Sequence, residues 1–187
     1  MADFQTSFSV TSANEGGYAN NPRDKGGQTY RGIARNFWPG WKGWPMIDEA
    51  LAAHKSVNGL AKKLDGLVAE FYTDQFWRPL GCDRLESQLI AGELFDTGVN
   101  MGIKQAARFL QEALVILGND KITVDGIIGA KTIAAANAAD SELLLITLNL
   151  LQGSKYLDIV RRDPSQRVFL RGWLRRAVPK TEMGKVE

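Results

Sequence analysis

The position of Glu15 suggests that its carboxyl does chemistry. Residues 3–14 are predicted to form a helix, and at about 100° per residue Phe4, Phe8 and Glu15 fall within roughly 40° of one another. Two glycines follow and would end this helix, so Glu15 is expected in the last turn with its side chain directed inward. Desolvation and the helix dipole would both raise the pKa of the carboxyl, as a general acid requires. The alternative is a helix-end glutamate that turns to solvent.

A second carboxylate and a hydroxyl follow at short intervals. Residues 20–33 are dense in turn-forming and then β-forming residues, which predicts a short hairpin or two-stranded ribbon. Asp24 lies nine positions after Glu15, and Thr29 lies five positions after Asp24. An acid at a helix end, followed by an aspartate and a threonine on an adjoining ribbon, is the arrangement of the phage-type lysozymes.

The motifs around these residues resemble glycoside hydrolase family 108, the N-acetylmuramidases found as phage or prophage endolysins and as so-called secretion activator proteins. The resemblance covers nearly the whole chain, because the second half is similar to the family's peptidoglycan-binding-like part. The order and spacing of the motifs make it specific. The matching residues are Glu15-Gly16-Gly17-Tyr18, Asn20, Pro22, Asp24, Gly26-Gly27, Thr29 and Gly32-Ile33 in the first half, and Phe95-Asp96, Val99-Asn100, Gly102, Val124-Asp125-Gly126, Ile128-Gly129, Lys131-Thr132, Phe169-Leu170 and Gly172-Trp173 in the second.

The resemblance implies cleavage of the β-1,4 bond between N-acetylmuramic acid and N-acetylglucosamine in bacterial peptidoglycan, with Glu15 as the acid. Glycoside hydrolysis also needs a group that stabilises the oxocarbenium-like transition state or activates water, and the spacing assigns that role to Asp24. Asp24 is otherwise explained as an Asx-turn residue, and Thr29 either orients the attacking water or is an ordinary strand threonine. Retaining and inverting mechanisms both stay open, since they differ in whether the carboxyl groups lie about 5 Å or about 6.5–9.5 Å apart.

Four further residues are candidates for substrate binding. Tyr18 and Tyr30 are the candidates in and beside the ribbon. Asp96 and Asn100 are one turn apart on a predicted helix over residues 87–100, and both side chains can hydrogen-bond N-acetyl groups or sugar hydroxyls. Asp96 is also the fallback for the second carboxylate, and its alternative is a polar residue satisfied by a neighbouring loop backbone.

The tryptophan-rich stretch over residues 37–45 has two interpretations. Trp38, Trp41 and Trp44 lie in it, and aromatic faces stack on sugar rings, so these residues would suit a glycan groove. Alternatively, they seal a small core beneath an irregular segment.

The predicted fold is mainly α and lysozyme-like, with a small β-ribbon after the first helix and a basic amphipathic helix at the carboxyl terminus. Apolar spacing predicts the later helices, which cover residues 45–54, 57–76, 87–100, 103–117, 131–139 and 141–162. A break at residues 77–81 separates two lobes of one compact domain. We expect a catalytic lobe over residues 1–86 and a helical, peptidoglycan-binding-like lobe over residues 87–187. Asp125 and Thr132 are expected to shape the turn that starts a helix rather than to bind ligand.

The carboxyl-terminal segment is strongly basic. Residues 161–187 hold eight Lys and Arg against three Asp and Glu, a net charge of +5, whereas the rest of the chain carries −3. Between residues 165 and 178 apolar residues recur at helical spacing with arginines beside them, so this helix either attaches to anionic membrane, lipopolysaccharide or wall polymer, or merely packs on the domain. The candidates for envelope binding are Arg167, Arg171, Trp173, Arg175 and Arg176.

Composition excludes several other classes of site. Cys82 is the only cysteine and His54 the only histidine, so we expect no internal disulfide, no metal site and no cofactor. No basic segment followed by an apolar core opens the chain, and no uninterrupted apolar run reaches the roughly 20 residues that span a bilayer. We therefore expect a monomer made in the host bacterial cytoplasm without a signal peptide, which acts on the cell wall after release.

Two classes of function fit these observations. The first is a bacteriolytic muramidase, and the second is a non-catalytic peptidoglycan-binding or secretion-assisting protein on the same fold. The Glu15 motif and Asp24 favour the enzyme, because a binding protein has no need of a buried acid. Nucleic-acid binding is disfavoured, since the basic patch is confined to one helix and the rest of the chain is acidic.

Overall fold

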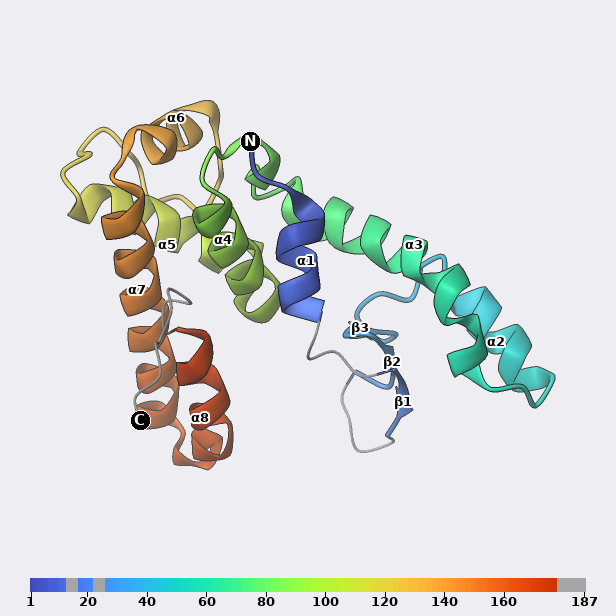
Figure 1. Cartoon of the computed structure of the whole chain (residues 1–187). Helices are drawn as coiled ribbons and strands as arrows, with labels where there is room; N and C mark the ends of the chain where they lie inside the picture. Colours follow the sequence, from blue (N-terminus) through green and yellow to red (C-terminus); the bar gives the residue numbers. More distant parts are fainter. Residues whose placement is uncertain (13–16, 22–25, 178–187) are drawn as a thin grey trace, which may run out of the picture. The chain divides into compact units, whose positions relative to one another are not determined.

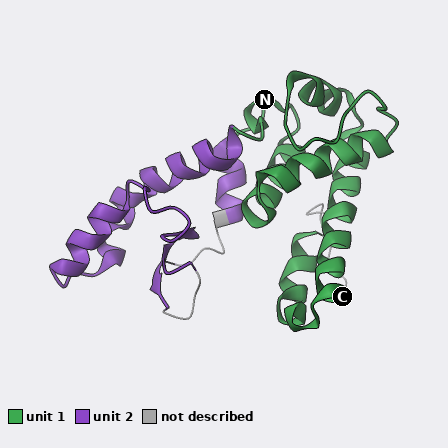
Figure 2. Ribbon diagram, turned by 180° about the vertical axis from the view of Figure 1, so that it is seen from behind, with its two compact units in different colours: residues 1–3, 79–187 green, residues 4–78 purple. Residues whose placement is uncertain are grey.

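The computed structural model describes residues 1–12, 17–21 and 26–177. Within these residues the chain forms two compact units, which Figure 2 colours separately. One unit contains residues 4–78, and the other contains residues 1–3 and 79–187. The functional division into a catalytic lobe over residues 1–86 and a binding lobe over residues 87–187 stays a prediction.

The unit over residues 4–78 contains a small antiparallel sheet. Helix α1 (Phe4–Ser12) is followed by the strands β1 (Tyr18–Asn20), β2 (Gln28–Tyr30) and β3 (Ile33–Ala34), with β2 in the middle (Figure 1). The sheet is the expected ribbon with one additional strand. Arg31 and Gly32 join β2 to β3 with φ angles of 43° and 78°, the left-handed values that a two-residue hairpin turn of type I′ requires.

Two helices and an aromatic core complete this unit. Helix α2 (Trp44–Ala52) leads through a 3₁₀ turn (Val57–Leu60) into α3 (Ala61–Tyr72), which widens into a π-helical turn (Thr73–Trp77). The expected single helix over residues 57–76 is therefore three consecutive elements.

The tryptophan-rich stretch belongs to this core. Trp41 and Trp44 are buried and meet edge to face at 5.2 Å, and the half-buried Trp38 meets Phe71 edge to face at 5.0 Å. The core-sealing interpretation therefore holds for Trp41 and Trp44. Buried aromatic rings thus form the apolar core of this short segment.

The second unit is helical. After a 3₁₀ turn (Cys82–Arg84) come α4 (Gln88–Met101), α5 (Ile103–Ile116), α6 (Ala130–Ala138) and α7 (Ser141–Arg162), then a 3₁₀ turn (Pro164–Gln166) and α8 (Arg167–Arg176). The α4 and α5 helices pack on each other and on α7 around fully buried residues. The largest of these buried side chains are Phe95, Leu80, Leu85, Ile90, Leu94, Leu110 and Leu114.

Helix α7 is the long helix of this unit. The Asp140 side chain caps it by accepting hydrogen bonds from the backbone nitrogens of Glu142 and Leu143 at 2.9 and 3.0 Å. Among the described residues, α7 alone is long and apolar enough to cross a membrane on length and composition. One face of it carries the buried Asn149 and Gln152 and packs against α4 and α5, so this face serves the core of the unit.

Helix α8 packs against α7 and confirms the expected basic amphipathic helix. Trp173 stacks on Tyr156 of α7 at 5.1 Å, while Arg171 and Arg175 are exposed. The described residues thus form a mainly helical protein with one three-stranded antiparallel sheet, as the sequence predicts.

Candidate active site

The predicted acid Glu15 and second carboxylate Asp24 lie outside the described residues, and their roles stay predictions. The elements on either side of them are described. Helix α1 ends three positions before Glu15, and β1 and β2 bracket the segment that contains Asp24. Asn20 of β1 pairs with Gln28 of β2, so the sheet holds together the two chain ends from which the Asp24 segment extends.

Thr29 lies on the central strand with small neighbours on both sides. It is paired with Ala19 of β1 and Ala34 of β3, and side chains directly opposite each other share a face of the sheet. The Thr29 hydroxyl is half-buried and donates to the Gly27 carbonyl oxygen at 3.3 Å. We call this row of one hydroxyl between two methyl groups the Ala19–Thr29–Ala34 face. The two methyl groups are small, which leaves room for another molecule beside the hydroxyl.

The opposite face of the same sheet belongs to the core. Tyr30 is 2% exposed and stacks on Trp41 at 5.9 Å, and burial raises the pKa of its phenol. Strand alternation places Tyr30 in the core, on the face opposite the half-buried Thr29, and the predicted contact of Tyr30 with substrate stays a prediction. Tyr18, paired with Tyr30, is half-buried, and its predicted contact with substrate stays a prediction.

Sequence reasoning missed the ion-pair network that joins the sheet to α2. The two guanidinium nitrogens of Arg35 donate to the two carboxylate oxygens of Asp48 at 2.6 and 2.7 Å, and one of them also donates to Gln28 at 2.7 Å. The guanidinium also lies 5.1 Å from the Trp44 ring centre. The Arg35 hydrogen bond lowers the pKa of Asp48, so this carboxyl is ionised near neutral pH. No periodicity in the sequence links residues 13 positions apart on different elements.

The described carboxylates of this unit are poor alternatives to Glu15. Four of the five take a basic partner: Asp48 with Arg35, Asp65 with Arg31, Glu70 with Lys42, and Asp74 with Arg78. The fifth, Glu49, is exposed on α2. A general acid must hold a proton near neutral pH, which burial promotes and a cation opposes. Within residues 4–78, the described part of the unit thus offers no buried carboxyl for this role.

Asp96 and Asn100 are hydrogen-bonded to each other, with Asp96 buried and Asn100 exposed. Asp96 is 7% exposed, and one of its carboxylate oxygens accepts from Arg176 of α8 at 3.0 Å. The Asn100 amide donates to the Asp96 backbone oxygen at 2.8 Å and to its carboxylate at 3.3 Å. Burial and the Asp96 charge raise the pKa of the neighbouring Tyr156 to about 12. The network ties α4 to α8, and the catalytic and substrate-binding roles predicted for Asp96 stay predictions.

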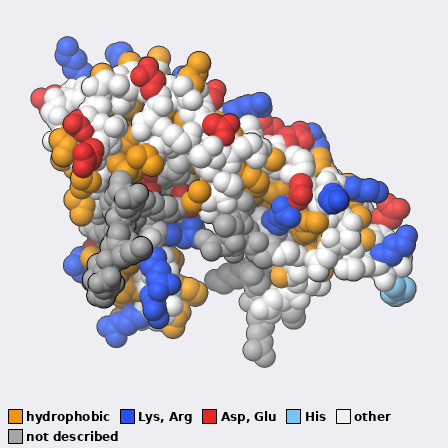
Figure 3. Space-filling view, in the orientation of Figure 1, with side chains coloured by type: hydrophobic (Ala, Val, Ile, Leu, Met, Phe, Trp, Pro, Cys, Tyr) orange, Lys and Arg blue, Asp and Glu red, His pale blue; other side chains and the backbone are white. Residues whose placement is uncertain are grey.

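The predicted envelope-binding residues of α8 fall into two groups. Arg167, Arg171 and Arg175 are exposed. Trp173 is half-buried in its stack on Tyr156, and Arg176 is engaged by Asp96. Figure 3 shows basic side chains beside hydrophobic ones over the α7–α8 region. On α8, Val168 is 78% and Phe169 54% exposed.

The turn before α6 is structural, as the sequence predicts. Gln111, 1% exposed on α5, donates to the Asp125 carboxylate at 2.7 Å and to the Ile127 oxygen at 3.0 Å, and it accepts from the Gly126 nitrogen at 2.7 Å. The Gln111 hydrogen bond lowers the pKa of Asp125. Gly126 has a φ of 83°, and a Cβ there would lie 2.9 Å from Lys104. Gln111 itself was missed, because glutamine on an amphipathic helix is ordinary.

The described residues contain no group of three His, Cys, Asp or Glu side chains that could hold a metal ion. His54 is exposed just beyond the end of α2. Cys82 is fully buried, and burial raises the pKa of its thiol far above the usual range, so the thiol stays protonated and unreactive.

Comparisons with known proteins agree with this architecture. Residues 8–102 match the family model described as glycosyl hydrolase 108, and residues 105–178 match the one described as "Predicted Peptidoglycan domain". The structure of SagA from Brucella abortus is similar with a TM-score of 0.67 at 23% identity, over 93% of this chain and 88% of that one. A search of curated proteins found no match.

The SagA likeness shows a shared fold, and the predicted mainly α, lysozyme-like class is confirmed. The first family match covers more than half of the chain and contains Glu15, Asp24 and Thr29. The second covers α5 to α8. The chain therefore belongs to the glycosyl hydrolase 108 family, and that match is followed by a peptidoglycan-domain region.

Proposed function

We propose that this protein is a lysozyme-type peptidoglycan hydrolase that cleaves the β-1,4 bond between N-acetylmuramic acid and N-acetylglucosamine, as a bacteriolytic endolysin does. The observation that carries the proposal is the pairing of the two family matches in one chain. A glycosyl hydrolase joined to a peptidoglycan domain has both the catalytic and the recognition chemistry for one polymer. Bacterial peptidoglycan is thus the substrate and the principal partner.

In the proposed reaction, Glu15 protonates the leaving-group oxygen, and Asp24 stabilises the oxocarbenium-like transition state or activates water. Thr29 orients the water from the Ala19–Thr29–Ala34 face. This role is supported by the pairing that leaves methyl groups on both sides of its hydroxyl. The paired carboxylates of the same unit support Glu15 indirectly, because four of the five are already bound to cations.

The experiment compares wild type with Glu15→Gln on purified peptidoglycan. Clearance of turbidity measures cleavage, and mass spectrometry of the released muropeptides identifies the new reducing ends. Removal of a general acid is expected to slow clearance by about 100-fold or more. Glu49→Gln is the matched control, since Glu49 is exposed on α2 and the substitution is the same. Circular dichroism checks that each variant is folded.

Muramic acid at the new reducing ends, with loss of activity only in Glu15→Gln, would establish the muramidase. Equal clearance by wild type and Glu15→Gln would show that Glu15 is not the acid. If neither protein cleared peptidoglycan while both sedimented with it, the non-catalytic binding or secretion-assisting function would replace the enzyme. The anomeric configuration of the first product, read by proton NMR, then separates a retaining from an inverting mechanism.

We also propose that α8 attaches the enzyme to anionic membrane or lipopolysaccharide. Arg171 and Arg175 are exposed, and Val168 and Phe169 add exposed apolar surface on the same helix. Trp173 is half-buried in its stack on Tyr156, and its predicted part in this contact stays a prediction. Attachment through the exposed residues needs no undocking of α8 from α7.

Charge reversal tests this attachment better than deletion of the helix, because deletion would also remove Trp173 from its stack and Arg176 from Asp96. The double variant Arg171→Glu/Arg175→Glu is compared with Lys62→Glu/Lys63→Glu, exposed residues of α3 that change the net charge equally. We expect the α8 variant alone to lose sedimentation with anionic vesicles and activity on intact cells, with activity on purified peptidoglycan retained. Equal sedimentation of both variants would contradict the proposal.

A further inference from the structure

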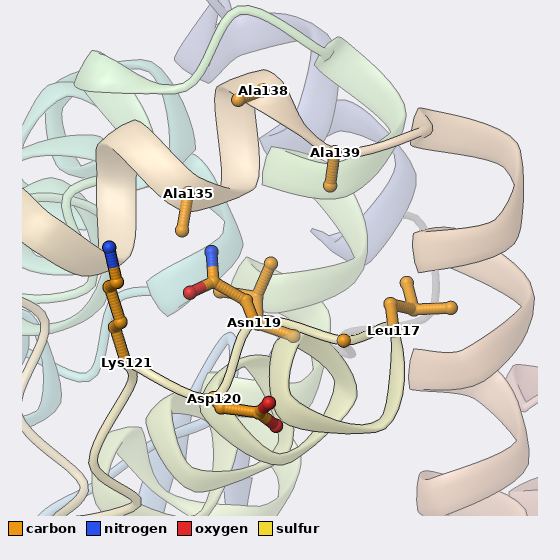
Figure 4. Close-up of a pocket in the computed structure, with 9 residues that line it drawn as sticks. Leu117, Asn119, Asp120, Lys121, Ala135, Ala138 and Ala139 are labelled. Carbon is orange, nitrogen blue, oxygen red and sulfur yellow. The ribbon is translucent and has the colours of Figure 1, made fainter.

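A pocket of about 540 Å³ lies within the peptidoglycan-domain region, between the end of α5 and one face of α6. Figure 4 shows Ala135, Ala138 and Ala139 on one side and the loop after α5 on the other. The volume lies within the range of roughly 300–1,000 Å³ that is typical of small-ligand pockets. The pocket is separate from the elements that carry Thr29 and the predicted carboxylates.

The apolar wall of this pocket is built for small groups. The lining includes Ala135 and Ala138 of α6, Ala139 just after it, Leu114 of α5 and Leu117 just after that helix, and Gly118 adds no side chain. None of the described residues that line the pocket is aromatic, so they offer no flat face on which a sugar ring stacks. Methyl-sized side chains of a ligand would fit such a wall better than a pyranose ring does.

Three consecutive polar residues, Asn119, Asp120 and Lys121, supply the remaining lining. The Lys121 side chain extends toward α6 at one end of the pocket, Asn119 points into the space below Ala135, and the Asp120 carboxylate lies beneath Asn119 (Figure 4). Asp120 and Lys121 are exposed, and neither forms an ion pair with another described residue. An amide, a carboxylate and an ammonium group are thus available to a ligand that carries the complementary groups.

We propose that this pocket binds a short alanine-containing peptide with a free carboxylate and a free amine, which is the chemistry of the peptidoglycan stem peptide. The alanine wall receives the ligand's methyl groups, Lys121 binds its carboxylate, Asp120 binds its amine, and Asn119 hydrogen-bonds its backbone. This assignment rests on the proposed function, since it takes peptidoglycan as the substrate. The enzyme then holds the peptide with one unit while the other cuts the glycan.

The test is isothermal titration of the full-length protein with the synthetic tetrapeptide N-acetyl-L-Ala-γ-D-Glu-meso-diaminopimelate-D-Ala, in which the diamino acid holds the one free amine. Ala138→Trp fills the pocket from an exposed position on α6, and Lys121→Glu reverses the charge at its end. Both variants are expected to weaken peptide binding at least about tenfold, the cost of one lost charge-assisted contact. Lys62→Glu is the control for net charge and is expected to bind like wild type.

A second arm tests Asp120 through the ligand. Acetylation of the free amine of the diamino acid removes the ammonium that Asp120 would bind. Wild type is expected to bind the acetylated peptide about tenfold more weakly, whereas Asp120→Asn is expected to bind both peptides equally. Equal binding of both peptides by wild type would remove Asp120 from the site.

The outcomes separate this proposal from the proposed function. A wild-type protein that clears peptidoglycan but does not bind the tetrapeptide, or binds it unchanged after both Ala138→Trp and Lys121→Glu, would overturn the pocket assignment and leave the hydrolase intact. A protein that binds the tetrapeptide through this pocket but cuts no glycan would support the pocket assignment and overturn the proposed hydrolase.

Discussion

The two units of this protein place their polar groups differently. In the unit over residues 4–78, four of the five described carboxylates pair with basic side chains at the surface, over a core of stacked aromatic rings. In the helical unit polar groups enter the interior, where Asn149, Gln152 and Asp96 are buried between helices. The first arrangement leaves Thr29 half-buried on the central strand of the sheet. The second uses polar contacts to fix which helices meet.

This contrast has an energetic side. Surface ion pairs contribute about 0–1 kcal/mol each, whereas loss of one partner from a buried pair costs several times more. The first unit should therefore depend chiefly on its aromatic core, and the second on matched polar contacts as well as apolar packing. Substitutions that remove one kind of contact from each unit test this difference.

Trp44→Ala is expected to have the largest effect. Trp44 is 1% exposed, donates to the Trp38 oxygen at 2.8 Å and packs on Trp41, so its loss should cost about 3–5 kcal/mol in the free energy of unfolding. Urea denaturation measures this cost, and Phe37→Ala, at a 67% exposed residue of the same stretch, should cost little.

Trp44→Ala also tests the independence of the units. We expect hydrolysis to be lost while sedimentation with peptidoglycan is retained. Loss of both would mean that the helical unit cannot bind without the first.

Arg176→Met should be next. The substitution removes the cation that lies 3.0 Å from the buried Asp96 carboxylate, at an expected cost of about 2–3 kcal/mol. The double variant Asp96→Asn/Arg176→Met should recover part of this loss, because no buried charge then lacks this partner. Thermal unfolding of both variants and of Arg175→Met, the exposed neighbour, measures the coupling. Additive losses would show that the pair is not coupled.

Gln111→Leu should destabilise the helical unit by about 2 kcal/mol. The substitution removes three hydrogen bonds of 2.7 to 3.0 Å around the Asp125–Ile127 turn, and it places an apolar side chain at this buried position of the helix. Hydrogen exchange should become faster in the turn before it does in α5. The half-buried Gln105 of the same helix offers the control, Gln105→Leu. Unchanged exchange in Gln111→Leu would contradict a structural role for this residue.

Thr29→Val should affect activity more than stability. Loss of the hydroxyl from the Ala19–Thr29–Ala34 face is expected to slow peptidoglycan clearance about tenfold, while unfolding changes within about 0.5 kcal/mol. Thr29→Ser keeps a hydroxyl and should retain most of the activity. If valine and serine variants were equally active, Thr29 would be only a strand residue.

The smallest effect concerns acid stability at Asp48. Arg35 holds the pKa of Asp48 below its ordinary value, so the pair stabilises the protein above pH of about 4 and this contribution is lost as the pH falls through the lowered pKa. Asp48→Asn should therefore flatten the fall in stability between about pH 4 and pH 2, by less than about 1 kcal/mol because the pair is half exposed. Glu49→Gln should leave the profile unchanged. A profile of Asp48→Asn identical to wild type would remove this pair from the acid response.

Local signals were sufficient for much of the fold. The predicted helix over residues 141–162 has the observed bounds, since a capping aspartate precedes it and a proline follows its end. The turn at Asp125 and Gly126 was also predicted as structural, because its residues act within a few positions of one another. The order of the motifs likewise led to the family before any tertiary contact was known.

Other features needed the tertiary structure. Alternation along β2 separates Thr29 from Tyr30 but does not say which of them faces the core, and the packing of Trp41 decides it. The sequence suggests Asp96 as a substrate ligand, and only the tertiary structure shows that it binds Arg176 of α8, 80 positions away.

The sequence by itself determined most of the helices, the presence of a β-ribbon and the residue types available for glycoside chemistry, because these depend on neighbours a few positions apart. Only the tertiary structure decided which aromatic rings form the core, that Asp96 binds Arg176 and that α5 and α6 enclose a pocket beside Asn119. The physical reason is that periodicity defines the faces of an element, whereas burial depends on the element that covers each face.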